Sequence, residues 1–450
     1  MEAKRRTLGI VLVNVALYAL AFQLQRPIEP FLVKKLGADD REYGKLQSFF
    51  SVFQSLGSPL VGMALDAVGA RVMFVVVFAA SATSYAILAN ATTIGILYLS
   101  KVPSVLQAGF LVAQALIASS TQGSTAERAA ALGRLTTAYT VGATLGPAAG
   151  GFFGANGDYY LGAKCAVMAS LFSAALALLL PRNIGKGGGE EKNIILKKGE
   201  EETSTSSSSS KNKEAKESSP PATTKRGRSK RTVDILRRVW PWLAAKASTG
   251  VTNSALGAAI PLVLRDRGFD EQKLGFGMSA TAIVVAVVGA FFVGPLSSAA
   301  GANLPALALA TKAMAVFAIA LATGIAGDYA ALICAGAVAA HAAVSHVLAT
   351  SLTTATTGLV QPNEQGSLLG IEHGLFAAAR IFGPTLGTTG LARFGIVSVA
   401  LLCAASDTLL ALAFPTTVRW ARPTASSKKP LAANENYPLT SGRADEKKNL

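Results

Sequence analysis

Charged residues, cysteines and histidines are all scarce in this chain of 450 residues. Charged side chains make up 15% of it, and it contains three cysteines and three histidines. Cys165, Cys334 and Cys403 lie far apart in apolar segments, so the sequence predicts neither a disulfide framework nor the paired spacing of a metal site. We therefore expect no bound metal and no cofactor.

Motifs for nucleotide-driven and hydrolytic chemistry are also missing. The sequence has no Gly-rich phosphate loop followed by Lys and Ser or Thr, so we do not expect the protein to use ATP. No nucleophile motif is present, and we expect a protein that is not an enzyme. The net charge of +16 comes from flanks and one linker without interleaved aromatic residues, which argues against nucleic-acid binding.

Long apolar segments make up most of the chain. Hydrophobic residues account for 51% of it, in recurring runs near the ~20 residues that one helix needs to cross a bilayer. A basic head, Met1 to Arg6, leads directly into the first run, so we expect an uncleaved anchor. We predict an all-α membrane protein, with the lipid bilayer as a partner and twelve transmembrane helices near 8–32, 44–64, 72–91, 94–118, 132–155, 159–180, 240–264, 274–297, 304–326, 329–356, 367–391 and 395–414.

The chain contains an internal duplication. Four residues recur 237 positions later, and an earlier set recurs 231 positions later. The first set is Gly133, Gly146, Pro147 and Gly150, matched by Gly370, Gly383, Pro384 and Gly387; the second is Pro30, Gly37, Asp39 and Gly44, matched by Pro261, Gly268, Asp270 and Gly275. Repeated sets of membrane spans are typical of secondary transporters, whose substrate binds between the repeats.

The duplication and the composition together predict the domain organisation. We expect two pseudo-symmetric six-helix bundles, at 1–180 and 239–414, joined by a disordered linker at 181–238 and followed by a tail at 415–450. The linker carries 15 basic and 8 acidic residues and is rich in serine, so it cannot bury a core. The excess of positive charge places the linker, and with it both termini, on the cytosolic side.

The membrane in which the protein resides is left open by the sequence. The plasma membrane is one expectation. The end of the chain, Lys447-Lys448-Asn449-Leu450, resembles the dilysine retrieval signal of endoplasmic-reticulum membrane proteins, which favours that membrane if the signal is read.

A short motif follows the second predicted span: Gly62-x3-Asp66-x2-Gly69-x-Arg71. It resembles motif A of the major facilitator superfamily, although the chain has alanine at two positions that are usually basic in that family. Glycines permit a tight turn, and an Asp–Arg pair in a short loop can hold one conformation. We therefore interpret Gly62, Asp66, Gly69 and Arg71 as gating residues; a simple capped turn is the alternative.

The fifth predicted span carries a second motif, Gly142-x3-Gly146-Pro147-x2-Gly150-Gly151. It resembles the antiporter motif, motif C, of drug:proton exchangers in the same superfamily. Glycines four residues apart form a groove for a neighbouring helix, and Pro147 removes a backbone hydrogen bond and bends the span. We expect this helix to seal one side of a cavity; a purely structural helix contact is the alternative.

Further stretches narrow the resemblance. The runs Lys34-Lys35-Leu36-Gly37, Ala130-Ala131-Leu132-Gly133-Arg134-Leu135 and Arg380-Ile381-Phe382-Gly383-Pro384, with Lys246, resemble the organic cation transporter-like group typified by solute carrier family 22 member 18. The similarity extends over nearly all of both halves. It implies proton-linked transport of an organic cation or drug. Lys101 stands where the superfamily often has an arginine, and it keeps the charge without the planar fork.

Ionisable and polar groups inside apolar spans indicate where a transporter works, because each is costly unless paired or hydrated. In the fold that the resemblance implies, the spans at 8–32, 94–118, 240–264 and 329–356 line the cavity. The candidates for the substrate cavity are Asn14, Tyr18, Gln25, Glu29, Lys101, Gln107, Lys246, Asn253, His341 and His346.

Four ionisable residues are candidates for proton coupling: Glu372, His373, Arg380 and Glu29. Histidine and a desolvated glutamate can both change charge near neutral pH. An ordinary pairing of Glu29 with Arg26 is the alternative for that carboxylate. We expect Lys312 to extend its ammonium to the membrane surface; no partner for Asp407 is evident from the sequence.

The predicted function is transport of a small organic solute by alternating access, with exchange against protons. The lysines and Arg380 make the cavity basic, which suits an anion or amphiphile and argues against assuming a cation from the family resemblance. A transporter fold that serves as a sensor or scaffold, and an uncoupled facilitator, are the alternatives.

Overall fold

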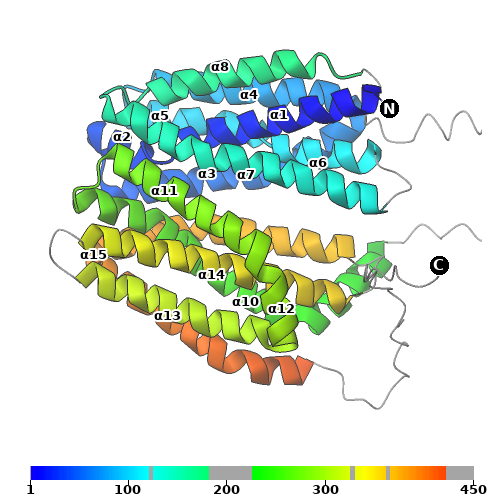
Figure 1. Cartoon of the computed structure of the whole chain (residues 1–450), viewed down its shortest axis with the longest axis vertical. Coiled ribbons are helices and arrows are strands. Elements are labelled where there is room, and N and C mark those ends of the chain that lie inside the picture. The colour runs from blue at the N-terminus through cyan, green and yellow to red at the C-terminus, as the bar shows by residue number, and fades with distance from the viewer. Residues whose placement is uncertain (1, 121–124, 182–224, 325–329, 361–364, 422–450) are drawn as a thin grey trace, which may run out of the picture.

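The computed structural model describes residues 2–120, 125–181, 225–324, 330–360 and 365–421. These residues form helices joined by short turns, and no strand occurs among them, as predicted (Figure 1). The expected linker and tail lie largely in residues 182–224 and 422–450, outside the described ranges.

The described part of the first half contains eight α-helices. The predicted span at 8–32 comprises α1 (Glu2–Leu24) and α2 (Glu29–Lys35), and the span at 94–118 is likewise interrupted, because Pro103 cannot donate a backbone hydrogen bond. The remaining elements are α3 (Asp40–Val68), α4 (Ala70–Ala89), α5 (Ile94–Lys101), the 3₁₀ segment η1 (Val102–Leu106), α6 (Gly109–Ser120), α7 (Thr125–Ala155) and α8 (Leu161–Ala177).

The second half begins with a long helix, α10 (Lys225–Asp266), which starts upstream of the expected span at 240. The others are α11 (Glu271–Val287), the π-helical segment η3 (Val288–Phe292), α12 (Val293–Ala300), η4 (Gly301–Asn303), α13 (Leu304–Gly324), α14 (Ala330–Gly358) and α15 (Gln365–Ala421). Gly395, with φ of 76°, interrupts α15 where the sequence predicts a new span to begin.

Within the described ranges, eight stretches are long and apolar enough to cross a membrane. Two of them, Glu271–Thr323 and Gly374–Val418, contain 53 and 45 residues, more than twice the ~20 residues that one crossing needs. The multi-span all-α class is therefore confirmed, while the count of twelve crossings stays a prediction.

The duplicated sequence produces duplicated local structure. Gly37 and Gly268 both adopt positive φ, at 81° and 85°, a conformation that favours glycine because it has no Cβ. Two residues further on, Asp39 accepts a hydrogen bond from the backbone N–H of Glu42, and Asp270 accepts one from that of Lys273. Each aspartate caps the helix that follows, so both halves begin their second long helix in the same way.

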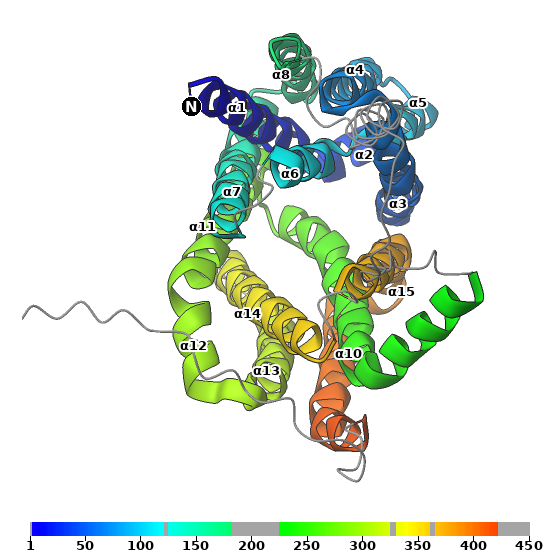
Figure 2. The ribbon, with the colours of Figure 1, turned by 90° about the vertical axis from the view of Figure 1, so that its right-hand side faces the viewer.

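The two halves lie side by side and contact each other through two helix pairs. Figure 2 shows α7 beside α11 at one side and α3 beside α15 at the other. Both contacts lie towards the end of the molecule that carries α2 and the turns near 37, 157 and 268, opposite the end where the chain begins (Figure 1). Each half has an apolar cluster of its own, and a further cluster joins Ala258 and Leu262 of the second half to buried residues of the first.

Candidate functional site

A glycine lies at each of the two helix contacts between the halves. A Cβ on Gly275 of α11 would lie 2.3 Å from the backbone oxygen of Pro147 in α7, and one on Gly44 of α3 would lie 2.7 Å from that of Pro384 in α15. Gly44 and Gly275 are equivalent in the duplication, as are Pro147 and Pro384. The same contact therefore occurs twice, related by the pseudo-symmetry of the chain.

Two hydrogen bonds reinforce these contacts at equivalent positions. The backbone N–H of Ala148 donates to Ser279 Oγ at 2.9 Å, and Ser48 Oγ lies 2.8 Å from Thr385 Oγ1. Nearby, Arg265 of α10 binds the carboxylate of Asp40, with Nη2 at 2.9 and 3.1 Å from its oxygens. Among the residues that the structure describes, every hydrogen bond between the halves lies near this end.

The glycines of the predicted antiporter motif divide between two neighbours of α7. A Cβ on Gly142 would lie 2.1 Å from Ala16 O, and one on Gly150 would lie 2.0 Å from Leu24 O, so both pack against α1; Gly146 faces Leu20 and Gln23 of the same helix. Gly151 faces Glu271 O and Gly275 of α11. One motif thus packs α7 within its own half and seals it against the other half.

The turn with the predicted gating residues is not tightly packed in this conformation. Gly69 connects α3 to α4 with φ of 84°. A Cβ on Gly62 would meet no atom within 4 Å, and the same holds for Gly294, which begins the related spacing Gly294-x3-Ser298-x2-Gly301 in the second half. Arg71 is partly exposed, and the side chain of Asp66 lies outside the described part, so their predicted pairing stays a prediction.

A cavity of about 550 Å³ lies between the halves beside the sealed end. Its polar lining includes the predicted residues Asn253, His341 and His346, together with Gln23 and Arg26 of the first half. His341 is 7% exposed, and its Nδ1 has no hydrogen-bond partner among the described residues. This cavity is bounded by α1, α7, α10, α11 and α14, so spans beyond the four expected ones contribute to it.

A second cavity, of about 280 Å³, contains an ion pair between α10 and α15. Lys246 Nζ lies 2.5 Å from Glu372 Oε2 and donates to Thr353 Oγ1 at 2.9 Å. Thr356 Oγ1 donates to the other oxygen of Glu372 at 2.7 Å. The pairing joins a predicted cavity residue to a predicted coupling residue. Glu372 and the two described histidines line different cavities and do not share one site.

A third cavity, of about 60 Å³, lies in the first half and also contains an ion pair. Glu29 binds Lys101 of α5, and its second oxygen accepts from Gln47 Nε2 at 2.5 Å. The alternative pairing of Glu29 with Arg26 is therefore wrong. The lining also includes Gln25, Gln107, Arg26 and, from the second half, Arg380.

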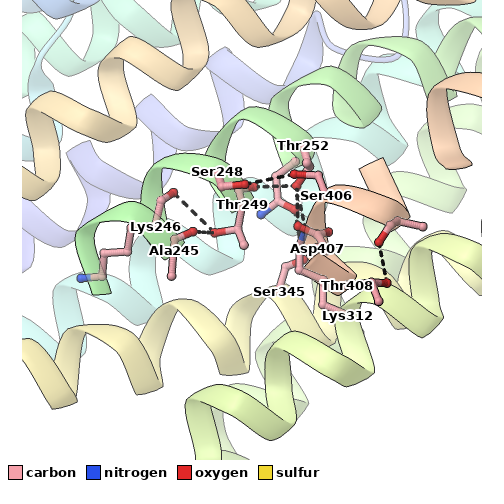
Figure 3. Close-up of polar contacts among 12 residues, drawn as sticks. Ala245, Lys246, Ser248, Thr249, Thr252, Lys312, Ser345, Ser406, Asp407 and Thr408 are labelled. Atoms are coloured by element: carbon pink, nitrogen blue, oxygen red, sulfur yellow. Dashed lines mark hydrogen bonds and ion pairs between the residues drawn. The ribbon is translucent and has the colours of Figure 1, made fainter. Parts of the chain in front are cut away.

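The structure reveals a buried ion pair that sequence reasoning missed (Figure 3). Lys312 of α13 binds Asp407 of α15, and both side chains are 0% exposed. Thr252 of α10 accepts a hydrogen bond from Lys312 Nζ at 2.7 Å and donates to Asp407 Oδ1 at 3.4 Å. The prediction that Lys312 extends to the membrane surface is wrong, because a buried carboxylate neutralises it. The sequence did contain one indication of this pairing, because it places two opposite charges deep within apolar spans.

Three predicted residues are not in the lining given for these cavities. Asn14 is fully buried, and its side chain has no partner among the described residues. Tyr18 Oη donates to the backbone oxygen of Gln107 at 2.8 Å, so it fixes the end of η1. His373 lies in α15, and its side chain is outside the described part.

The structure consists of two helical bundles that repeat one design, and the cavities that they enclose have ionisable linings. This arrangement defines a multi-pass membrane transporter. The chain belongs to the Major Facilitator Superfamily, whose sequence profile matches residues 11–345. That family consists of transporters rather than enzymes.

Each of the following curated relatives aligns with only part of the chain. Human solute carrier family 67 member A1 is 35% identical over 159 residues, 34% of this chain and 37% of the relative. Mouse solute carrier family 22 member 18 is 32% identical over 177 residues, 38% of this chain and 43% of the relative, which confirms the resemblance predicted from the sequence. The class G tetracycline resistance protein of Vibrio anguillarum is 33% identical over 150 residues, 32% of this chain and 37% of the relative. The aligned segments thus span about two fifths of these relatives.

Solved transporters share the fold over nearly the whole chain. The human organic anion transporter MFSD10 aligns with a TM-score of 0.61 and 17% identity, over 91% of this chain and 99% of its own. A peptide transporter POT, solved with sulfate, aligns with a TM-score of 0.70 and 13% identity, over 92% of this chain and 95% of its own. At such identities the likeness shows the fold alone.

Proposed function

We propose that the protein is a secondary active transporter that exchanges a small organic solute for protons by alternating access. The observation that carries the proposal is the Lys246–Glu372 pair, which lines a cavity formed by α10, α14 and α15 of the second half. An ammonium and a carboxylate in contact can each bind or release a proton, and each is costly to leave unpaired in an apolar environment.

The coupling step follows from this geometry. While Glu372 is ionised, it holds Lys246 and accepts from Thr356. A proton on Glu372 removes the negative charge and releases Lys246, whose ammonium is then free to bind a solute or to reorient. Solute and proton thus compete for one pair of side chains, which is the requirement for exchange. The Glu29–Lys101 pair is the second candidate for the same chemistry.

The conformational step rests on the contacts between the halves. Both glycine contacts and all described interhalf hydrogen bonds lie at one end, while Gly62 and Gly294 at the other end have open space around them. We propose that this conformation opens towards the end at which α1 begins and α15 ends, which the positive-inside rule assigns to the cytosol. The division into bundles at 1–180 and 239–414, with a cytosolic linker and tail, belongs to the same proposal.

The relatives support a role in moving organic solutes out of a compartment. Several carry names of multidrug or tetracycline resistance proteins, and the structural neighbours include an organic anion transporter and a peptide transporter. The cavity of about 550 Å³ is within the ~300–1,000 Å³ of small-molecule sites.

Flux in liposomes tests the proposal. The full chain is reconstituted, and uptake of tetracycline, 4-phenylbutanesulfonate and (4-phenylbutyl)trimethylammonium is measured with and without a pH gradient. The last two probes share one body and have a fixed charge, so pH does not alter their own leakage. We expect at least one probe to accumulate when a gradient is imposed and to lose that accumulation when a protonophore is added.

Substitution assigns the coupling group. Glu372→Gln should abolish gradient-driven accumulation and retain solute-for-solute exchange, because the solute path is intact but the proton site is lost. Lys164→Gln is the matched control, because the exposed Lys164–Asp158 pair lies outside the cavities. Probe uptake that is the same with and without the pH gradient would identify an uncoupled facilitator. Absence of flux for every probe would favour a sensor or scaffold.

A further inference from the structure

Two arginines from opposite halves line one small cavity. Arg26 lies in the turn between α1 and α2, and Arg380 lies in α15; both line the cavity of about 60 Å³ that also contains the Glu29–Lys101 pair. Arg26 is exposed and also lines the larger cavity of about 550 Å³. The two cavities therefore adjoin at a guanidinium group.

Neither guanidinium has a carboxylate partner among the described residues. Glu29, the acidic residue of this cavity, is occupied by Lys101 and Gln47. The ionisable groups that act on Arg380 are Arg26, Tyr139 and Tyr18, and none is a carboxylate. Phe376 supplies an aromatic ring 5.9 Å from the guanidinium. Two like charges thus face each other across the halves with nothing in the described protein to neutralise them.

An unpaired donor lies in the same lining. Gln107 is 4% exposed, and its Nε2 has no hydrogen-bond partner among the described residues. A buried donor without a partner costs free energy of order 1–3 kcal/mol, which a bound acceptor would recover. Gln25 Nε2 is also unpartnered, but it is directed at Gly162 of α8, so we leave it out of the ligand set.

The larger cavity supplies an apolar compartment next to this group of donors. Leu256, Ile260, Leu264, Phe269 and Met278 are part of its lining. A ligand with its charged end at Arg26 would extend its body between these side chains. The arrangement as a whole presents positive charge and N–H donors at one end and hydrocarbon at the other.

We propose that Arg26, Arg380 and Gln107 bind the oxyanion head of an amphiphilic organic anion whose apolar body occupies the larger cavity. Guanidinium groups suit carboxylate and sulfonate heads, because their N–H donors match two oxygens at once. This inference rests on the proposed transport function and specifies its substrate class. Because the arginines belong to different halves, the anion also neutralises the repulsion between them and favours the conformation in which they face each other.

Equilibrium binding to the full chain in detergent tests the inference without any gradient. The probes are 4-phenylbutanesulfonate and (4-phenylbutyl)trimethylammonium, together with their eight-carbon homologues. We expect the sulfonates to bind at least roughly tenfold more tightly than the matched ammonium ions. Arg26→Gln and Arg380→Gln should each weaken sulfonate binding by roughly tenfold or more, as expected for a lost charge-assisted hydrogen bond.

Two further variants separate binding from folding. Arg380→Lys keeps the charge and should retain part of the affinity, while Lys164→Gln removes a cation outside the cavities and should leave affinity unchanged. Each variant is compared with the unsubstituted chain by melting midpoint and size-exclusion profile. If a glutamine variant does not fold, the lysine variant at the same position replaces it. A sulfonate affinity below that of the unsubstituted chain then supports the inference, and an unchanged sulfonate affinity overturns it.

The outcomes separate this inference from the transport proposal. It is overturned if no sulfonate binds better than its ammonium counterpart, or if Arg26→Gln and Arg380→Gln both leave sulfonate affinity unchanged. Flux of the ammonium probe without sulfonate binding would retain the transporter and discard the anion site. Sulfonate binding that needs both arginines, without flux in liposomes, would retain the anion site and discard the transporter.

Discussion

At the scale of single residues, the buried Lys312–Asp407 pair shows how charge is accommodated in an apolar bundle. Both side chains are fully buried, and Thr252 provides a further hydrogen bond to each. The attraction offsets the cost of removing two charges from water only while both partners are present. The pair lies outside the lining of the three cavities described above, so we assign it to the stability of the second half.

Removing one partner should therefore destabilise the protein far more than removing both. Asp407→Leu leaves an unpaired ammonium and should cost about 3–5 kcal/mol, whereas Lys312→Met combined with Asp407→Leu should lie close to the unsubstituted chain. Unfolding midpoints in detergent would measure this. Removing the exposed Lys164–Asp158 pair, the control, should cost about 0–1 kcal/mol. Equal losses for the single and double changes would show that the pair is not a coupled unit.

The Asp158 carboxylate, in the turn before α8, illustrates the opposite environment. The backbone N–H of Tyr160 and the Lys164 ammonium hold its pKa below the ordinary value. Because the pKa of Asp158 is lower in the folded protein than in the unfolded protein, its carboxylate stabilises the fold at pH values above the unfolded-state pKa. This contribution is lost as the pH falls through the folded-state pKa. Because the turn is solvent-exposed, we expect the contribution to be small.

At the scale of elements, the contact between α7 and α11 holds the sealed end. A Cβ on Gly275 would lie 2.3 Å from the backbone oxygen of Pro147, a distance that requires the helices to move apart. Gly275→Ala should therefore disfavour this conformation and raise access to the cavity from the sealed side. Labelling of a cysteine at Asn253, in a background without the three native cysteines, would report that access.

Gly9→Ala is the control for this experiment, because a Cβ on Gly9 meets no atom within 4 Å. It should leave labelling from both sides unchanged. If Gly275→Ala also left labelling unchanged, the contact between α7 and α11 would not determine which end is sealed.

The glycines Gly62 and Gly294 should behave differently, because they have open space here and, in the proposed alternating access, this end closes in the other conformation. Gly62→Val should change the free energy of unfolding by no more than about 1 kcal/mol, because there is space for the side chain and valine is a better helix former than glycine. The melting midpoint should therefore stay close to that of the unsubstituted chain. Turnover in liposomes should fall, because the added bulk hinders closure of this end. Unchanged turnover would mean that α3 does not approach a neighbour at Gly62 during the cycle.

At the scale of the whole molecule, the two halves are related by a repeat that also governs how they touch. Ser48 and Thr385 contact each other at one side, and Ser279 and Ala148 do so at the equivalent place on the other. A rocking motion of the halves must break both contacts together. The protein is therefore expected to cycle between two discrete closures rather than to deform gradually.

A crosslink across this contact should stop the cycle. With the native cysteines replaced, Ser48→Cys combined with Thr385→Cys places two thiols where the hydroxyl oxygens lie 2.8 Å apart. Oxidation should abolish flux, and a reductant should restore it, because the halves can no longer separate at the sealed end. Each single substitution serves as the control and should be insensitive to oxidant. Flux that continues in the crosslinked protein would exclude separation of the halves at this point.

The sequence by itself determined the class and the local design of this protein. Apolar runs of bilayer length, the duplicated glycines and the capping residues Asp39 and Asp270 act within a few neighbouring residues, so they can be interpreted without a fold. The motif around Pro147 likewise pointed to a helix that packs closely on its neighbours, because closely spaced glycines let two backbones approach.

Only the tertiary structure decided which charges meet and which end is closed. Lys312 and Asp407 are 95 positions apart, and Glu29 and Lys101 are 72 apart, so their pairing depends on how each helix is rotated against its neighbours. The same rotation places His341 and His346 in a different cavity from Glu372, and it leaves Arg26 and Arg380 without a carboxylate partner among the described residues. Periodicity along one helix fixes which residues share a face, but the packing of distant helices fixes what that face meets.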